Sequence, residues 1–378
     1  MTSANSSRVS RTARRVALVG GGTAGHVYPA LAVAEAYRAA VPGASMLFIG
    51  TPNGFERSIL TAHGERLELI DGAPFFGVGM RGRLRTLSHL ARGTYQARHL
   101  LRTEGIVLVV GFGGYASAGV LLAARSLGLR TVIHEANLLP GLANRLVARV
   151  VDRVHLGFDA ARRWFPPAKT VVTGIPIRQV FTRIAAARTP PTGRGDGARR
   201  LLVTGGSLGS EFLNRAVPEL VGRLRDLGLA LEVRHQTGHR DAPAVARAYA
   251  DAGIAASVTP YIDDMPGAYA WADFAITCAG AITLAELAAA GLPALLVPYA
   301  PASEDHQRPN AQAFADATGV WWVSEDAWRA TTLAERLALL LTDETAWRAL
   351  SARLRALAPF DAAARVVAEC EALLHGST

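Results

Sequence analysis

The sequence contains only two cysteines and a single lysine among 378 residues. Cys278 and Cys370 lie far apart, so neither a disulfide framework nor a cysteine-rich zinc site is expected, and a reducing compartment is favoured. No uninterrupted apolar run approaches the roughly 20 residues that a transmembrane helix needs. These scarcities predict a soluble, cytoplasmic protein that holds no metal.

Because Lys169 is the only lysine, almost all of the positive charge comes from arginine. The formal net charge of +9 permits nucleic acid, phospholipid headgroups or a phosphorylated substrate as partners, and composition alone does not choose among them. Residues 1–14 include several arginines but lack the apolar segment of a signal peptide, and we expect a disordered tail there.

Short β-branched runs alternate with longer helical patterns along the chain, which predicts parallel sheets covered by helices. A segment rich in Pro, Gly and Arg, ARTPPTGRGDGARR, separates two series of such units. Each series contains a buried strand followed by a glycine-rich turn, VALVGGGTAG in the first and LLVTGGSLGS in the second. The predicted fold class is therefore α/β, with two Rossmann-like domains facing each other across a cleft.

The first glycine-rich turn matches the pattern G-x-G-x-x-G at Gly20, Gly22 and Gly25. A nicotinamide site also requires an acidic residue about 20 positions later, where this chain has the uncharged sequence FIGT. The lysine of an ATP-binding P-loop is replaced by His26. What remains is an anion-binding turn in which His26 either caps the helix or, as a neutral imidazole, accepts a proton from a substrate hydroxyl.

Eight motifs in chain order together resemble the MurG-type enzymes of glycosyltransferase family 28. These motifs are GGGTAGHVYPALAVAEA, GFGGYAS, HEAN, GIPIR, GGSLGS, YIDDMPGAYAWAD, GAITLAELAAAGLPALLVPY and EDHQRPNA. The resemblance implies a GT-B fold with a C-terminal helix that crosses back to the first domain. The implied divisions are the tail (1–14), an acceptor-binding and membrane-associating domain (15–175), a UDP-sugar-binding domain (176–357) and the returning helix (358–378).

The resemblance also implies inverting, metal-independent transfer of a sugar from a UDP-sugar, with His26 as the catalytic base. The donor-binding residues that it implies are Arg178, Gly206, Ser207, Ile262, Ala281, Ile282, Thr283, Glu286, Gln307 and Asn310. The acceptor-binding residues that it implies are Thr23, Gly25, Gly113, Gly114, Tyr115 and Asn137. Tyr115 could equally be a core aromatic, and Arg178 a surface arginine. We expect Asp263 and Asp264 to cap the following helix rather than to bind a metal.

The segment from residue 75 to residue 102 contains six arginines and no acidic residue. Its expected membrane-facing patch consists of Phe75, Phe76, Met80, Arg81, Arg83 and Arg85. Apolar side chains beside such charge suit adsorption to an anionic membrane, and the family has its membrane-facing patch in this region. The alternative is an ordinary amphipathic helix with its arginines in solvent.

We therefore expect a UDP-sugar-dependent hexosyltransferase that acts at the inner face of the cell membrane on a prenyl-phosphate- or diphosphate-linked glycolipid. No cofactor, metal or nucleic-acid partner is expected. Departures from the family pattern at Leu208, Cys278 and Ala300–Pro301 favour a paralogue of phosphoglycolipid-antibiotic (moenomycin-like) biosynthesis. The milder departures of this chain, at Ala136 and Ile175, resemble forms found in actinobacterial-type members. One alternative is the cell-wall enzyme, which transfers GlcNAc from UDP-GlcNAc to undecaprenyl-diphospho-muramoyl-pentapeptide. The other is a non-catalytic, membrane-associated binding subunit.

Overall fold

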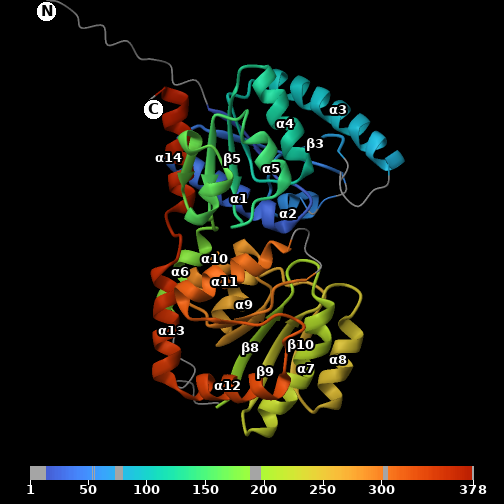
Figure 1. Ribbon diagram of the computed structural model, residues 1–378, viewed down its shortest axis with the longest axis vertical. Helices are drawn as coiled ribbons and strands as arrows, with labels where there is room; N and C mark the ends of the chain where they lie inside the picture. Colours follow the sequence, from blue (N-terminus) through green and yellow to red (C-terminus); the bar gives the residue numbers. More distant parts are fainter. Residues whose placement is uncertain are drawn as a thin grey trace, which may run out of the picture.

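The computed structural model describes residues 14–52, 54, 56–72, 80–187, 197–300 and 305–376, with side chains except at 80–87, 115 and 185–187. Within these ranges the chain forms two parallel sheets, one above the other in Figure 1, each covered by helices. The buried β-branched runs become the strands, because parallel strands covered on both faces must be apolar throughout.

The first sheet has seven strands in the order β3-β2-β1-β4-β5-β6-β7, all parallel. Its strands are β1 (Arg15–Val19), β2 (Ser45–Gly50), β3 (Leu67–Leu69), β4 (Leu108–Gly111), β5 (Arg130–Glu135), β6 (Arg153–Leu156) and β7 (Thr170–Val172). The helices of this domain are α1 (Ala24–Ala40), α2 (Glu56–Ala62), α3 (Met80–Thr103), α4 (Tyr115–Ser126) and α5 (Leu142–Val147), with short 3₁₀ helices η1 (Asp159–Trp164) and η2 (Pro167–Lys169).

The second sheet has six parallel strands in the order β10-β9-β8-β11-β12-β13. They are β8 (Arg199–Thr204), β9 (Leu231–Gln236), β10 (Ala255–Thr259), β11 (Phe274–Thr277), β12 (Ala294–Leu296) and β13 (Trp321–Trp322). Its helices are α6 (Val180–Ala187), α7 (Glu211–Asp226), α8 (Ala242–Asp251), α9 (Met265–Trp271), α10 (Ala281–Ala290), α11 (Gln307–Thr318), α12 (Ala330–Thr342) and α13 (Glu344–Ala356).

The last helix, α14 (Ala362–His375), leaves the second domain and runs along the first (Figure 1). Val366, Val367 and Cys370 are buried in the same apolar cluster as α1 and β1. Burial of these side chains stabilises the attachment of α14, by about 25 cal/mol per Å² of apolar surface. The predicted α/β class, with two Rossmann-like domains and a returning helix, is confirmed.

Strand order reverses once in each sheet, between β1 and β4 in the first and between β8 and β11 in the second. In open α/β sheets, ligands bind outside the carboxyl ends of the strands at such switch points. The turns that leave these four strands contain Gly20–Thr23, Gly111–Gly114, Gly205–Gly209 and Cys278–Gly280. The topology therefore brings both predicted glycine turns to the positions where a ligand is expected.

Candidate active site

At the first switch point, the turns after β1 and β4 pack directly on each other around His26. A Cβ built on Gly113 would lie 2.9 Å from Nε2 of His26 and 3.0 Å from its Cδ2. Gly113 also has a φ of +107°, which L side chains rarely adopt. Glycine at this position therefore lets the backbone pass close to the ring edge, and the predicted residues His26, Gly113 and Gly114 form one site.

The hydrogen bonds of His26 decide which ring nitrogen carries the proton. Nδ1 lies 2.9 Å from the carbonyl oxygen of Gly21, and 3.3 Å from Oγ1 of Thr23. Since a carbonyl oxygen can only accept, Nδ1–H donates to it, and Nε2 of the neutral ring keeps its lone pair. Nε2, on the side of Gly113, is then the nitrogen that can accept a proton.

Burial lowers the pKa of His26 below its ordinary value. The hydrogen bond with Gly21 opposes this shift, the nearby His306 adds to it, and the Glu56 carboxylate opposes it. The imidazole is therefore neutral at physiological pH, which is the form that a general base requires.

The turn after β5 is organised by a buried carboxylate, Glu135. Its Oε1 accepts from the backbone and side-chain amides of Asn137 at 2.9 and 3.2 Å, and its Oε2 accepts from Nδ2 of Asn144 at 2.9 Å and from the N–H of Gly141 at 3.2 Å. Burial raises the pKa of Glu135, and these hydrogen bonds oppose the rise. Four donors on one carboxylate hold the predicted acceptor residue Asn137 in a single orientation.

On the donor side, the turn after β8 presents Gly206, which is exposed, and Ser207, which is half-buried. The carbonyl of Gly206 accepts from Nε2 of Gln236 at 2.6 Å, which ties the turn to β9. Helix α7 begins only at Glu211, with Ser210 as its N-cap. Ser207 therefore lies in the turn that precedes the helix and not at the helix start. A Cβ built on Gly209 would collide with the carbonyl oxygen of Thr237, so this turn packs closely against the residue that follows β9.

Glu286 lies on α10, one turn after Ala281, Ile282 and Thr283, which form the first turn of that helix. Its carboxyl group is buried, which raises its pKa to about 7, while the positive charge of Arg178 and a hydrogen bond with Tyr269 oppose the rise. A carboxylate in this position is an acceptor for neighbouring hydroxyl groups.

The guanidinium of Arg178 lies over the Tyr28 ring at 4.5 Å from the ring centroid. The hydroxyl of Tyr28, on α1, is 3.1 Å from the hydroxyl of Tyr261, which precedes the half-buried Ile262. An aromatic residue of the first domain thus contacts an arginine and a tyrosine of the donor side, so Arg178 is not a free surface arginine.

Gln307, at the start of α11, accepts through Oε1 from the N–H groups of Ala279 and Tyr299, at 2.9 and 3.0 Å. This orientation leaves its Nε2 without a hydrogen-bond partner among the described residues. One turn later the fully buried Asn310 accepts from the N–H of Leu138 at 2.9 Å and donates to Oδ1 of Asn137 at 3.1 Å. A predicted donor residue and a predicted acceptor residue therefore bond to each other across the domains.

Other predictions have mixed outcomes. Thr23 and Gly25 lie exposed at the start of α1. Of the expected capping pair Asp263 and Asp264, it is Asp264 that is the N-cap of α9, since its Oδ1 accepts from the N–H of Gly267 at 2.9 Å. Within the ranges that the structure describes, no group of three or more His, Cys, Asp or Glu side chains could hold a metal ion.

The membrane patch and one acceptor residue are only partly covered by the structure. Phe75 and Phe76 lie outside the described residues. Met80, Arg81, Arg83 and Arg85 lie at the start of α3, and the side chains there, like that of Tyr115, are not described.

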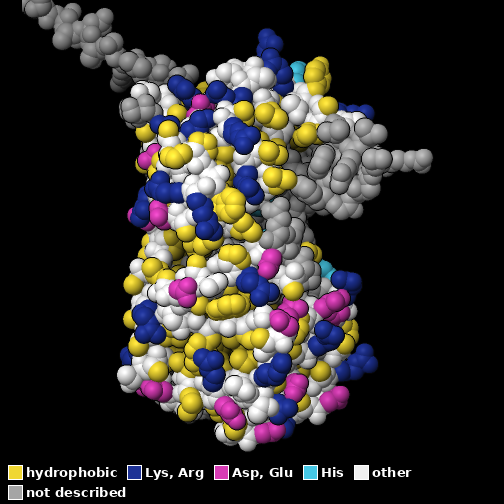
Figure 2. Space-filling model, in the orientation of Figure 1, with side chains coloured by type: hydrophobic (Ala, Val, Ile, Leu, Met, Phe, Trp, Pro, Cys, Tyr) yellow, Lys and Arg dark blue, Asp and Glu magenta, His cyan; other side chains and the backbone are white. Residues whose placement is uncertain are grey.

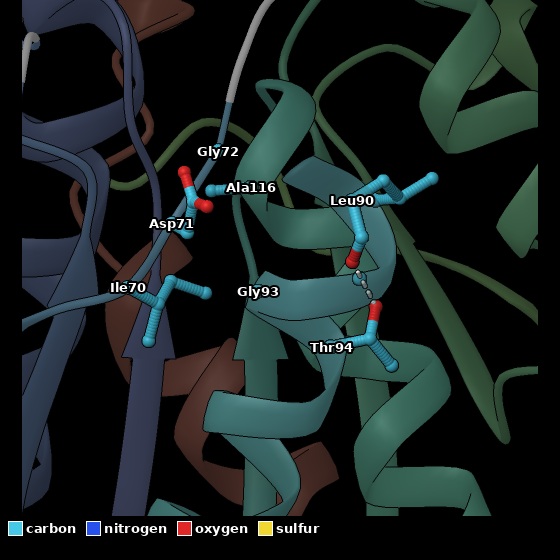
Figure 3. A pocket seen from close by; sticks show the side chains of 8 residues that line it. Ile70, Asp71, Gly72, Leu90, Gly93, Thr94 and Ala116 are labelled. Atoms are coloured by element: carbon cyan, nitrogen blue, oxygen red, sulfur yellow. Dashed lines mark hydrogen bonds between the residues drawn. The ribbon is translucent and has the colours of Figure 1, made fainter. Parts of the chain in front are cut away.

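A small cavity between α3 and α4 has a volume of about 10 Å³, which leaves room for about one water molecule. Its lining is formed by Ile70, Asp71, Gly72, Leu90, Gly93, Thr94, Ala116 and Gly119. Figure 3 shows this lining and the bond from Thr94 Oγ1 to the carbonyl of Leu90 at 2.8 Å. It is too small for a sugar nucleotide. Beside this cavity, α3 is attached to the segment after β3, because Nδ1 of His89 lies 2.8 Å from Oδ1 of Asp71.

Sequence reasoning missed four residues of this region, namely Glu56, Glu135, Tyr28 and Tyr261. Both carboxylates are buried, but only Glu56 is far in sequence from a turn that it holds, since Gly22 lies 34 positions away. The tyrosines meet only because the two domains face each other. Glu135, Tyr28 and Tyr261 lie inside the quoted motifs, which was a signal that could have found them, whereas Glu56 lies outside all eight motifs.

Two family models together cover most of the chain. The N-terminal domain of glycosyltransferase family 28 matches residues 16–156, and the C-terminal domain of that family matches residues 200–365. The chain belongs to glycosyltransferase family 28. The predicted enzyme class, a glycosyltransferase, is thereby confirmed, as is the MurG-type resemblance.

This family-28 glycosyltransferase is similar to curated relatives along almost its entire length. It is 38% identical over 356 residues to the UDP-N-acetylglucosamine–N-acetylmuramyl-(pentapeptide) pyrophosphoryl-undecaprenol N-acetylglucosamine transferase of Geobacter metallireducens, covering 94% of this chain and 97% of the relative. It is 42% identical over 365 residues to the transferase of the same name from Chromohalobacter salexigens, covering 95% and 97%. The crystal structure of Acinetobacter baumannii MurG superposes with a TM-score of 0.72 at 30% identity, covering 94% and 98%. In the described part of the chain, no helix has both the length and the apolar character needed to cross a membrane.

Proposed function

We propose that this glycosyltransferase transfers GlcNAc from UDP-GlcNAc to undecaprenyl-diphospho-muramoyl-pentapeptide. The observation that carries the proposal is the end-to-end similarity to transferases named for that reaction, with 94% of this chain aligned to 97% of one relative. The antibiotic-pathway reading finds no support among these relatives, which favour the cell-wall alternative.

In the proposed reaction, an acceptor hydroxyl attacks the anomeric carbon of the donor sugar. A C–O bond forms to the acceptor oxygen, the C–O bond to the diphosphate of UDP breaks, and Nε2 of His26 takes the hydroxyl proton. Attack from the side opposite the leaving group inverts the anomeric centre. The Nδ1–H bond to Gly21 keeps Nε2 free for this step.

The departing diphosphate requires positive charge or N–H donors. We assign this role to the backbone and hydroxyl of the turn at Gly206 and Ser207, the amino end of α10, and Arg178. No cofactor is required in this proposal, because the UDP-sugar is itself the substrate.

The remaining donor contacts follow from the orientation of each side chain. Glu286 accepts from the ribose hydroxyls, and the backbone at Ile262 faces the uracil. Because Oε1 of Gln307 is already occupied, its Nε2 is the atom available to a sugar oxygen. A site that donates to a sugar hydroxyl discriminates against a sugar in which that oxygen is missing or misplaced.

We further propose that the first domain associates with an anionic membrane at the cytoplasmic face. Residues 15–175 contain 18 Lys and Arg against 9 Asp and Glu, whereas residues 176–378 contain 19 against 22. In Figure 2 the upper domain accordingly shows mostly basic side chains among the charged ones, while both signs mix on the lower domain. Figure 1 shows α3 outside the first sheet, with its amino end directed away from the body. Flotation with vesicles that contain or lack anionic lipid tests this, and equal binding to both would contradict it.

UDP release tests the proposed reaction. Release should depend on both UDP-GlcNAc and a prenyl-diphospho-muramoyl acceptor, and other UDP-sugars should react more slowly. The gene should also restore growth of a strain depleted of its own enzyme for this step. Activity with another UDP-sugar and acceptor but no complementation would favour the specialised paralogue, and the absence of release with every pair would favour a binding subunit.

A further inference from the structure

Glu56 is a fully buried carboxylate behind the first glycine turn. No lysine or arginine forms an ion pair with it among the residues that the structure describes. A buried carboxylate with no cation is costly unless several donors satisfy it. A Cβ built on Gly21 would lie 2.8 Å from Oε1 of Glu56. A Cβ built on Gly50 or Gly54 would likewise collide with the Glu56 side chain. Three glycines thus enclose this group.

The carboxylate links the end of β2 to the turn after β1. Its Oε1 accepts from the N–H of Thr51 at 2.8 Å and from the Thr51 hydroxyl at 3.0 Å. Its Oε2 accepts from the N–H of Gly22 at 3.2 Å. Both oxygens are therefore used, and one of them bonds to the turn that carries His26.

The N–H of Gly22 and the carbonyl of Gly21 belong to one peptide group. Since that group is planar, Glu56 and His26 bind its two opposite sides: the N–H donates to Glu56, and the carbonyl accepts from Nδ1–H of His26 at 2.9 Å. Hydrogen bonds in series polarise one another, so a charged acceptor on the N–H makes the carbonyl a stronger acceptor for the imidazole.

We propose that Glu56 is a positioning residue for His26, which acts through the Gly21–Gly22 peptide group to hold the imidazole with Nε2 free. The inference rests on the proposed role of His26 as the base. Glu56 touches no substrate in this arrangement; it fixes the tautomer and direction of the group that does.

Charge supports the same assignment. The titratable groups that influence His26 are Glu56 on α2 and His306, which comes from the second domain just before α11. Burial lowers the pKa of His26, while the negative charge of Glu56 favours the protonated ring and so raises that pKa. Removing the charge of Glu56 therefore makes His26 a weaker base.

The variant Glu56→Gln, compared with Thr51→Val, tests the proposal. Thr51→Val removes one hydroxyl from the same buried site but keeps the carboxylate and its bond to Gly22. We expect Glu56→Gln to lower kcat by about 10-fold or more with an unchanged KM for the UDP-sugar, and to move the acidic limb of the kcat/KM profile to lower pH. Thr51→Val should leave that limb in place. In a His26→Ala background, Glu56→Gln should have no further effect on kcat.

Identical pH profiles for wild type and Glu56→Gln, or equal losses in the presence and absence of His26, would overturn the proposal. If Glu56→Gln does not fold, ¹⁵N NMR of the histidines in the wild-type protein decides instead. The neutral His26 ring should carry its proton on Nδ1, and a proton on Nε2 would refute the inference. Because this measurement needs no substrate, its result is independent of whether the proposed donor and acceptor are correct.

Discussion

Asn310 of the second domain donates from Nδ2 to Oδ1 of Asn137 in the first domain, at 3.1 Å. The same Asn310 side chain accepts from the buried N–H of Leu138. Residues proposed to bind opposite substrates are therefore hydrogen-bonded to each other.

Asn310→Ala should destabilise the protein by about 1–3 kcal/mol, because it leaves the buried N–H of Leu138 without an acceptor. Asn137→Ala is the comparison variant, since it removes the other member of the pair and one of the four donors to Glu135 but keeps the bond between Leu138 and Asn310. It should cost less. Thermal or urea unfolding measures both, and equal losses would show that the bond to Leu138 is not the important one.

His26→Ala should reduce kcat by about 10²–10⁴-fold, the usual contribution of a general base. UDP affinity should be unchanged, because the imidazole lies on the first domain near Gly113. His99→Ala, at an exposed histidine on α3 of the same domain, serves as the control. Turnover measured by UDP release and affinity measured by calorimetry check the two halves of this prediction, and normal turnover would remove His26 from catalysis.

UDP binding should depend on pH through Glu286, whose pKa is raised to about 7 by burial. In the proposed binding mode the ribose hydroxyls donate to the carboxylate, so UDP should bind the deprotonated form. Affinity should therefore be highest above pH 7 and fall as the pH decreases through 7, approaching about 10-fold per pH unit below it. Calorimetric titration from pH 6 to pH 8 measures this. Glu286→Gln should bind weakly at every pH, and retention of the pH dependence in that variant would point to another group.

Gly113→Ala should abolish most activity. The substitution both forces a side chain into the φ of +107° and places a Cβ 2.9 Å from Nε2 of His26. Gly128→Ala separates the two causes, because Gly128 has a φ of +74° but nothing within 4 Å of its Cβ position. Both variants should lose roughly 1 kcal/mol or more of stability from backbone strain. Only Gly113→Ala should lose turnover, and equal kinetic losses would contradict the site geometry.

The elements that were predicted correctly depend on local pattern. The strand runs and the turns after them, such as Gly20–Thr23, follow from buried β-branched residues and glycine spacing, and parallel pairing then places these turns at one edge of each sheet. The cap at Asp264 was also predictable, because N-capping involves residues only three positions apart. The close packing of Gly209 against Thr237, the residue after β9, was not predictable, because it joins segments that are distant in the sequence.

The sequence by itself determined the fold class, the family and the list of candidate groups. Periodicity, glycine spacing and the order of motifs can all be recognised along the chain without knowing which segments meet in space. Only the tertiary structure decided how those groups are used. It placed the Glu56 carboxylate across one peptide group from His26, and Tyr28 against Arg178 and Tyr261. These relationships join residues from separate strands and separate domains, and their geometry exists only after the sheets have formed and packed against each other.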